Sequence, residues 1–232
     1  MDLLKITKID WSNLRDQLRR GKLSWKHGEH ASIIGPTGAG KTYLGLRLLP
    51  LHEHTIILAA KAEDSTLTRY ARTEGHTILR QWPPNDWDTR SIIWPKYKQP
   101  GDEAKQRAIF AESINAIFAE RNRTLFIDEV SYLTKRLKME LYLSALWEQG
   151  RSLKISLLAA TQRPRGVPLL MYDMPHHLFF FRFNDENDLK RIGGIGYLDR
   201  KEIQHCVARL DQYEFLYIHV PTGSMFISKV ED

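Results

Sequence analysis

The sequence predicts an α/β fold built on a mostly parallel central sheet, with helices on both faces and a β-hairpin at the C-terminus. Three observations support this prediction. Short apolar runs alternate with segments of helical periodicity along the chain, which is typical of parallel strands joined by helices. A glycine-rich loop separates one of these apolar runs from a helical segment. Near the end of the chain, two strand-like segments flank the turn sequence Pro-Thr-Gly-Ser at residues 221–224, which predicts the hairpin.

The predicted helices are recognised by apolar residues that recur every three or four positions. Trp11, Leu14 and Leu18 follow this spacing and predict an amphipathic helix over residues 10–21. Ser65 is a candidate N-cap for the helix that begins there. The predicted helices cover residues 10–21, 43–49, 65–72, 103–120 and 138–149.

The predicted strands are short runs rich in apolar and β-branched residues, bounded by polar or turn residues. Four largely apolar residues, Thr124–Ile127, are typical of a strand buried on both faces of a parallel sheet. The last two strands form the hairpin. The predicted strands cover residues 30–34, 55–59, 77–79, 91–94, 124–127, 155–160, 177–183, 214–220 and 225–230.

Length and composition indicate one globular α/β domain. At 232 residues the chain is long enough for one large core but leaves little for a second. We therefore expect a single domain over residues 1–232, with residues 1–24 as a helical N-terminal extension. No apolar run reaches the roughly 18 residues that span a bilayer, and the N-terminus lacks the layout of a secretion signal. Cys206 is the single cysteine, so we expect a cytoplasmic protein without disulfides or membrane contact.

The glycine-rich loop matches the pattern GxxxxGK[ST] at every fixed position, in the strand–loop–helix setting that the pattern requires. Its glycines allow backbone N–H groups and the N-terminus of the following helix to point at phosphate oxygens. Lys41 is expected to reach the β- and γ-phosphates of ATP, and the Thr42 hydroxyl to coordinate Mg²⁺. The predicted nucleotide-binding residues are Gly35, Pro36, Thr37, Gly38, Ala39, Gly40, Lys41 and Thr42.

Two carboxylates follow the buried strand that ends at Ile127. Ligands bind at the carboxyl ends of strands in sheets of this kind. We therefore predict that Asp128 holds Mg²⁺, directly or through water, and that Glu129 orients and deprotonates the attacking water. A Glu directly after this Asp is typical of water-activating P-loop ATPases of the additional-strand, RecA-like type.

Polar residues also end the strand predicted at residues 155–160, where Thr161 and Gln162 follow the apolar run. We expect this strand to lie between the P-loop strand and the Asp128 strand. The Gln162 amide is then the predicted sensor of the γ-phosphate. Phosphoryl transfer also benefits from an inserted arginine. Arg151 is the best candidate, positioned to act on a neighbouring subunit, and Arg163 and Arg165 are alternatives.

Positive charge is concentrated near these motifs. The chain carries a net charge of +6 with a pI near 9.3. Between residues 131 and 165 there are seven cations and two anions, Glu140 and Glu148. A basic surface beside a nucleotide site is what contact with a phosphate backbone requires. The seven cations are Lys135, Arg136, Lys138, Arg151, Lys154, Arg163 and Arg165.

Taken together, these motifs resemble the FtsK/HerA superfamily of DNA-pumping ATPases, particularly the small genome-packaging ATPases of viruses. The similarity spans roughly residues 25–230 and is most specific at residues 150–152 and 158–164. Residues 60–64, Ala-Lys-Ala-Glu-Asp, are similar to a turn of that family. They depart from it at Ala60, where the family has an acid, which leaves the role of this turn open.

The resemblance implies ATP hydrolysis in a homo-oligomeric ring, usually of five or six subunits, with double-stranded DNA in the central channel. It also implies that the arginine matching Arg151 acts in trans. Lys135, Arg136 and Lys138 are the predicted DNA contacts, with Lys96 and Lys98 as a second choice. A packaging motor of this kind docks on a portal or capsid vertex, which for a viral protein lies in the host cytoplasm.

Three other functions compete with DNA translocation. A morphogenesis or secretion ATPase would keep the fold but move protein. A slow nucleotide-switch adaptor would bind ATP and partners, but the intact Glu129 and Gln162 argue against it. A small-molecule P-loop kinase fits least, because no lid-like arginine-rich insert is recognisable.

Overall fold

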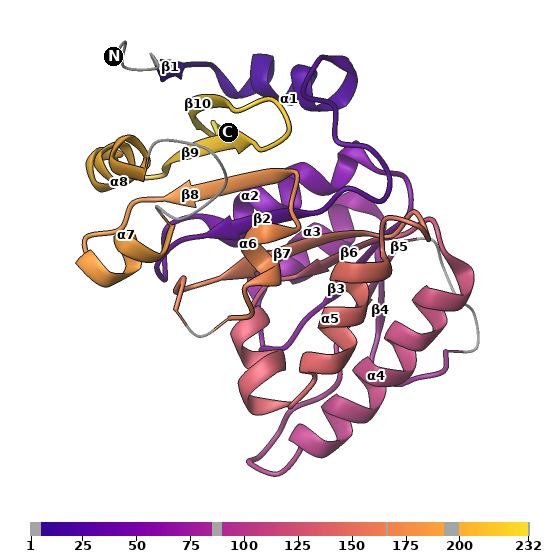
Figure 1. Cartoon of the computed structure of the whole chain (residues 1–232). Helices are drawn as coiled ribbons and strands as arrows, with labels where there is room; N and C mark the ends of the chain where they lie inside the picture. Colours follow the sequence, from indigo (N-terminus) through magenta and orange to yellow (C-terminus); the bar gives the residue numbers. More distant parts are fainter. Residues whose placement is uncertain (1–5, 85–89, 166, 193–199, 232) are drawn as a thin grey trace.

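The computed structural model describes residues 6–84, 90–165, 167–192 and 200–231. Within these ranges the chain forms one sheet of ten strands in the order β1-β10-β9-β8-β2-β7-β6-β3-β5-β4 (Figure 1). The strands are β1 (Thr7–Lys8), β2 (Ala31–Ile34), β3 (Thr55–Leu58), β4 (Thr77–Leu79), β5 (Arg90–Ile93), β6 (Thr124–Ile127), β7 (Ser156–Thr161), β8 (His177–Phe181), β9 (Glu214–His219) and β10 (Ser224–Lys229).

The sheet is mostly parallel, as the sequence predicts. Every neighbouring pair from β8 to β4 is parallel, whereas β9 runs antiparallel to both β8 and β10. β9 and β10 form the C-terminal hairpin. β7 lies between β2 and β6, which is the predicted position of the strand that leads to Gln162. The polar ends of these three strands therefore meet at one edge of the sheet.

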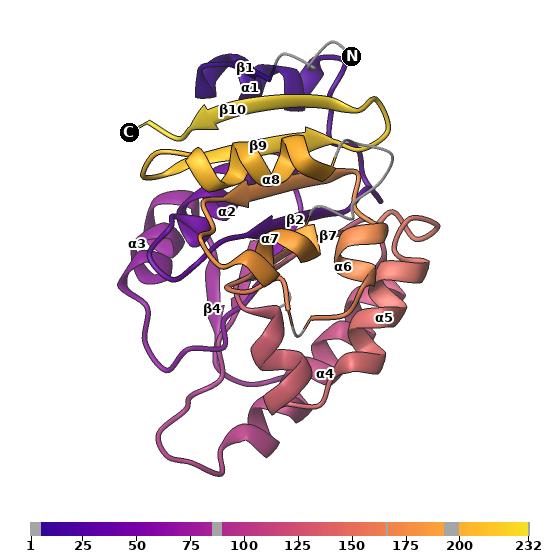
Figure 2. The same cartoon turned by 60° about the vertical axis from the view of Figure 1, so that its left-hand side comes forward.

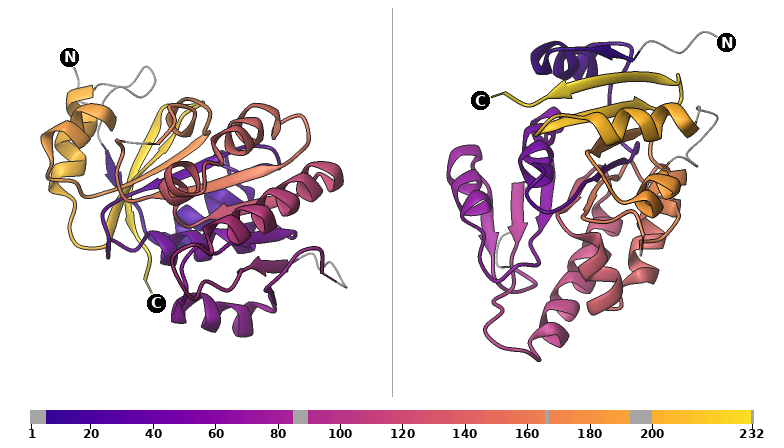
Figure 3. Two further views of the ribbon diagram at one scale, coloured as in Figure 1. Left: turned by 90° about the horizontal axis from the view of Figure 1, so that it is seen from below. Right: turned by 90° about the vertical axis from the view of Figure 1, so that its left-hand side faces the viewer.

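Helices cover both faces of the sheet (Figures 1 and 3). Successive strand residues point to opposite faces, so Phe126 enters one core and its neighbour Ile127 enters the other. The first core includes residues of α1, α2 and α3, and the second includes residues of the later helices (Figure 2). The helices are α1 (Trp11–Arg20), α2 (Lys41–Leu48), α3 (Ser65–Glu74), α4 (Glu103–Glu120), α5 (Glu140–Gln149), α6 (Leu170–Asp173), α7 (Glu186–Ile192) and α8 (Arg200–Arg209), with a short 3-10 turn, η1 (Leu49–Leu51), after α2.

The predicted N-terminal helix packs against the sheet. Leu14 and Leu18 of α1 are fully buried, and the ring of Trp11 meets that of Phe215 edge-on at 6.3 Å between centroids. β1 adds a short parallel pairing to β10. Residues 1–5 of the predicted extension lie outside the described part of the chain. Within the described ranges, no helix combines the length and the apolar character needed to cross a membrane.

Several predicted boundaries need correction. The helix predicted from Lys138 begins at Glu140, because a π-helical turn, η2 (Tyr132–Arg136), precedes it and Lys138 has φ of +53°. The N-cap of α3 is Asp64, not Ser65, since the Asp64 carboxylate accepts a hydrogen bond from the Leu67 N–H. β8 ends at Phe181, two residues before the predicted end.

Candidate nucleotide site at the P-loop

The glycine-rich loop joins the end of β2 to the start of α2. Gly38 and Gly40 have φ of +78° and +105°, conformations that glycine adopts without steric cost. Gly35 is required for a different reason, since a Cβ there would lie 2.6 Å from the Cβ of Phe181. The loop therefore wraps closely around the N-terminus of α2, where free N–H groups attract anions.

Lys41 is buried at the first position of α2, and its ammonium donates to the carbonyl of Pro36 at 2.9 Å. Burial lowers the pKa of Lys41 from its ordinary value, while Glu129 and Asp128 offset part of that effect. Lys41 thus lies between the loop and the two carboxylates. The γ-phosphate of a nucleotide is expected in the same place.

Thr42 and Asp128 lie together as the sequence predicts for a magnesium site. The Thr42 hydroxyl donates to Asp128 Oδ1 at 2.6 Å. Hydroxyl and carboxylate oxygens suit Mg²⁺, which is usually held by few protein oxygens and completed by phosphate and water. The described residues contain no group of three or more His, Cys, Asp or Glu that could hold a metal ion. A Mg²⁺ ion at this site would therefore need phosphate oxygens as ligands in addition to Thr42 and Asp128.

Lys61 is a site residue whose role the sequence left open. It lies in the turn after β3, and its ammonium contacts Asp128 Oδ2 at 2.9 Å and Asp64 Oδ2 at 3.2 Å. Burial opposes the charge on Lys61, but the two carboxylates outweigh it and raise the pKa of Lys61 above its ordinary value. The sequence feature that could have identified Lys61 is the similarity of residues 60–64 to a turn of the FtsK/HerA superfamily, from which these residues depart at Ala60.

Glu129 and Gln162 line the same pocket as Lys41, Thr42 and Asp128. Glu129 Oε1 accepts a hydrogen bond from the Ser131 hydroxyl at 2.6 Å and a longer one from Thr161 at 3.5 Å. The Thr37 hydroxyl donates to Gln162 Oε1 at 2.8 Å. Residues predicted at the ends of three separate strands thus line one pocket, here named the phosphate hollow, whereas the predicted loop residues Gly35, Pro36 and Ala39 are not part of its lining. Its lining includes Thr37, Gly38, Gly40, Lys41, Thr42, Lys61, Asp128, Glu129 and Gln162.

The three candidate arginines have different settings. Arg151 lies in the turn between α5 and β7, at the end of β7 farthest from Gln162. Arg165 bonds to Asp188 at 3.0 Å and to Asp185 at 3.3 Å within its own chain. Arg163 is exposed, directly after Gln162. Arg151 therefore lies away from the phosphate hollow of its own subunit, and Arg165 is committed to an internal contact.

The predicted DNA-contacting cations follow Asp128 and Glu129 in the chain, on and after η2. Lys135, Arg136 and Lys138 are all exposed. Arg136 is paired with Glu103 at 3.0 Å, so its charge is partly offset. Lys135 and Lys138 line a surface hollow together with Leu141, whose exposed fraction is 84%.

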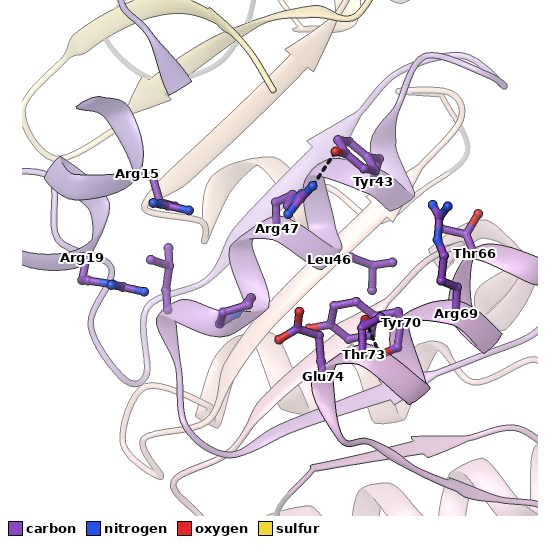
Figure 4. A pocket seen from close by; sticks show the side chains of 12 residues that line it. Arg15, Arg19, Tyr43, Leu46, Arg47, Thr66, Arg69, Tyr70, Thr73 and Glu74 are labelled. Carbon is purple, nitrogen blue, oxygen red and sulfur yellow. Dashed lines mark hydrogen bonds between the residues drawn. The ribbon is translucent and has the colours of Figure 1, made fainter. Parts of the chain in front are cut away.

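A second group of cations was not predicted. Figure 4 shows a hollow between α1, α2 and α3, here named the arginine hollow, with one acid, Glu74, on its wall. Its cations come from separate elements, which is why no local run marks them in the sequence. This hollow adjoins the phosphate hollow through shared Tyr43, Thr66 and Arg69. The cations of the arginine hollow are Arg15, Arg19, Arg47 and Arg69.

No protein-family model matches the chain, and no curated protein matches it by sequence. Solved structures do match. The DNA-packaging ATPase B204 of Sulfolobus turreted icosahedral virus aligns with a TM-score of 0.69 and 20% identity, over 90% of this chain and 100% of that chain. VirB4 of Thermoanaerobacter pseudethanolicus aligns with a TM-score of 0.69 and 12% identity, over 88% of this chain and 89% of that chain.

The genome-packaging NTPase B204 of Sulfolobus turreted icosahedral virus 2, solved with AMPPCP, is also similar. Its TM-score is 0.64 and its identity is 18%, over 88% of this chain and 99% of that chain. The chain thus shares its fold with these two B204 proteins and with VirB4.

Proposed function

We propose that this chain is an ATPase that couples ATP hydrolysis to the translocation of double-stranded DNA, most concretely as a viral genome-packaging motor. The observation that carries the proposal is the convergence of Lys41, Thr42, Asp128, Glu129 and Gln162 on one hollow. Together these residues supply the cation, the magnesium ligands and the general base that hydrolysis of a triphosphate uses, which supports the proposal.

In the proposed reaction, the P-loop N–H groups and Lys41 hold the β- and γ-phosphates. Thr42 and Asp128 would hold Mg²⁺, which neutralises phosphate charge when bound. Glu129 accepts a proton from water as the water oxygen bonds to the γ-phosphorus and the bond to the ADP oxygen breaks. Gln162, already bonded to Thr37 at the loop, registers whether the γ-phosphate is present.

Two observations support DNA as the proposed cargo: the positive charge of the chain and its similarity to the solved structure of a DNA-packaging ATPase. The chain has a net charge of +6, and Lys135, Arg136 and Lys138 are exposed beside the catalytic acids. One similar structure is named as a DNA-packaging ATPase and another as a conjugation coupling protein, the latter with a TM-score of 0.55 and 14% identity. On this proposal the chain works in the cytoplasm as a homo-oligomeric ring of five or six subunits, docked on a portal or capsid vertex.

Protein transport is the second candidate function. A type VII secretion ATPase, EccC, is among the similar structures, with a TM-score of 0.56 and 15% identity over 25% of its own chain. Within the described residues, the surface charge favours DNA over this alternative.

One experiment tests the proposal. ATP hydrolysis is measured with and without long double-stranded DNA at several salt concentrations, for the native chain, Glu129→Gln and the matched control Glu112→Gln. We expect DNA to stimulate the native chain at low salt, and Glu129→Gln to lose about 10²–10⁴-fold in rate while it still binds ATP. Glu112 is exposed on α4, away from the predicted DNA contacts, so its variant should behave like the native chain.

Two results would contradict the proposal in different ways. An undiminished rate of ATP hydrolysis in Glu129→Gln would show that Glu129 is not the general base. Normal hydrolysis without any DNA binding or stimulation at low salt would leave the ATPase but remove the DNA cargo, because phosphate contacts strengthen steeply as salt falls.

A further inference from the structure

Another hollow borders the P-loop, and its lining contains neither Asp128 nor Glu129. It measures about 380 Å³ and shares Thr37 and Gly38 with the phosphate hollow. One wall is the loop itself, and the opposite wall comes from the residues after β8 and from the turn before β9. We name it the tyrosine hollow, after Tyr213, which lines it.

Tyr213 is placed against the P-loop. Gly40 lies so close that a Cβ there would contact the Tyr213 ring at 3.6 Å. Tyr213 is 47% exposed and lines the hollow. The ammonium of Lys229 lies 5.9 Å from the ring centroid, which helps to fix the ring. An aromatic surface is thus held within contact of the loop that is proposed to bind the phosphates.

The backbone at Tyr213 is strained, with φ of +66°, which is rare for a bulky residue. Its neighbours hold this conformation. The Glu214 N–H donates to the Asp211 carbonyl at 3.1 Å, and the Asp211 N–H donates to the Glu214 carboxylate at 2.9 Å. Lys8 of β1 pairs with the same carboxylate at 2.8 Å. Strain that the surroundings maintain is characteristic of ligand sites.

The chemistry of this hollow fits a nucleobase. A planar base can stack on the tyrosine ring. The side-chain amides of Asn184 and Gln212 lie in the same lining and supply both hydrogen-bond donors and acceptors. Arg182, beside them, donates to Asn184 Oδ1 at 3.3 Å. The hollow therefore combines one aromatic face with groups that can bond to the edge of a base or to a ribose.

The arginine hollow is the competing location, because it also adjoins the phosphate hollow. Its aromatic ring nearest the P-loop, Tyr43, is already engaged by Arg47, which donates to the Tyr43 hydroxyl at 2.7 Å and lies 5.0 Å from its ring centroid (Figure 4). Its remaining cations favour an anion over an uncharged base.

We propose that the base of the bound nucleotide lies in the tyrosine hollow and stacks on Tyr213. This inference rests on the proposed function, since it assumes that the triphosphate occupies the P-loop. It adds a specificity-determining residue that lies far along the sequence from the phosphate-binding motif. The triphosphate then runs across the loop from Lys41 toward Gly38, with the base beyond Thr37.

The test compares ligands with and without a base. Dissociation constants for Mg·ATP and Mg·tripolyphosphate are measured by calorimetry for the native chain, Tyr213→Gly, Tyr213→Phe and Lys41→Ala. Glycine removes the ring and also accepts the positive φ. We expect Tyr213→Gly to weaken ATP binding about tenfold or more and to leave tripolyphosphate binding unchanged. Tyr213→Phe should retain ATP binding, and Lys41→Ala should weaken both ligands.

The outcomes separate the two proposals. Native ATP affinity in Tyr213→Gly, with weakened binding in Lys41→Ala, overturns the base site and leaves the proposed function intact. Native ATP affinity in Lys41→Ala overturns both. Photolabelling of the unmodified chain with 8-azido-ATP gives an answer that does not depend on any variant. Label on peptides that contain Asn184 or Tyr213 supports the inference, and label on the Tyr43 or Tyr70 peptide overturns it.

Discussion

Gly45 illustrates how tightly single residues are fitted around the P-loop helix. It lies within α2, and a Cβ at this position would fall 2.5 Å from the ring of Phe126 on β6. Alanine normally favours a helix over glycine by about 1 kcal/mol. Here the absence of a side chain allows α2 to approach β6, the strand that leads to Asp128 and Glu129.

We predict that Gly45→Ala lowers the free energy of unfolding by about 1–2 kcal/mol, because overpacking outweighs the gain in helix propensity. Urea denaturation measures this change. The double variant Gly45→Ala/Phe126→Leu is the control, since a smaller side chain at 126 provides room for the new methyl group. It should be more stable than the sum of the single effects by about 1 kcal/mol. Strict additivity, or a more stable Gly45→Ala, would contradict the prediction.

The residues of the site were predictable to different degrees. The P-loop and the Asp128-Glu129 pair depend on local patterns, and strand order then brings Gln162 to them. Lys61 and Tyr213 could not be assigned from the sequence because their roles depend on contacts across the fold. Lys61 reaches Asp128 from the turn after β3, and Tyr213 reaches Gly40 from a distant part of the chain.

At the scale of elements, the strands were predicted best. A buried parallel strand leaves a continuous apolar run, so β3, β6 and β7 were predicted to within one residue at each end. The short helices α6 and α7 were missed because few turns give too little periodicity to recognise. The helix α8 was also missed, although its ten residues match the length of α1. The two-residue strand β1 has no pattern of its own and exists through its pairing with β10. The turn η2 (Tyr132–Arg136) was not predicted, since the sequence analysis placed no element between Ile127 and Lys138.

The element formed by η2 and the start of α5 carries the predicted DNA contacts. We expect the double variant Lys135→Ala/Lys138→Ala to bind double-stranded DNA more weakly, with a salt slope smaller by about 2, since each lost phosphate contact contributes roughly 0.9. Fluorescence anisotropy at several salt concentrations measures the slope. Arg15→Ala/Arg19→Ala removes the same charge from the arginine hollow and is the matched control. An equal loss in both variants would indicate that only net charge matters.

At the scale of the molecule, histidines gather at the sheet edge opposite the P-loop. Trp25 and His52 rings lie 4.4 Å apart, and His177 and His219 rings 5.2 Å apart. Burial lowers the pKa of His52 to about 3 and of His30 and His219 to about 4, from an ordinary value of 6.5. These side chains are therefore neutral in the folded chain at pH values where the unfolded chain binds protons.

We predict that the free energy of unfolding is highest above about pH 6.5 and falls as the pH decreases toward 4. Over that window the unfolded state binds more protons, so each such histidine contributes a slope of up to about 1.4 kcal/mol per pH unit. Urea denaturation at pH 7.5, 6 and 5 measures it. His52→Gln cannot titrate and should have a shallower slope. Equal stability of the native chain at pH 7.5 and 5 would contradict the prediction.

The role proposed for Arg151 depends on a second subunit, because Arg151 lies away from the phosphate hollow of its own chain. The six residues of β7, Ser156–Thr161, span roughly 20 Å. Arg151 lies in the turn before β7 and Gln162 follows its last residue. The turn that holds Arg151 is therefore at the opposite edge of the sheet from the phosphate hollow. Any action of Arg151 on a phosphate must therefore occur at a neighbouring subunit. We predict that Arg151→Ala lowers the rate of ATP hydrolysis by about 10³-fold without weakening ATP binding.

Mixing subunits tests this arrangement directly. Arg151→Ala subunits retain an intact P-loop, and Lys41→Ala subunits retain the arginine, so a mixed ring contains complete sites at some boundaries. We expect steady-state hydrolysis to reappear on mixing two inactive variants. Lys154→Ala removes an exposed cation from the same turn and should remain active alone, which separates a specific role from loss of charge. If rings shown by native mass spectrometry to be mixed remain inactive, the nucleotide site is completed within one subunit or by another residue.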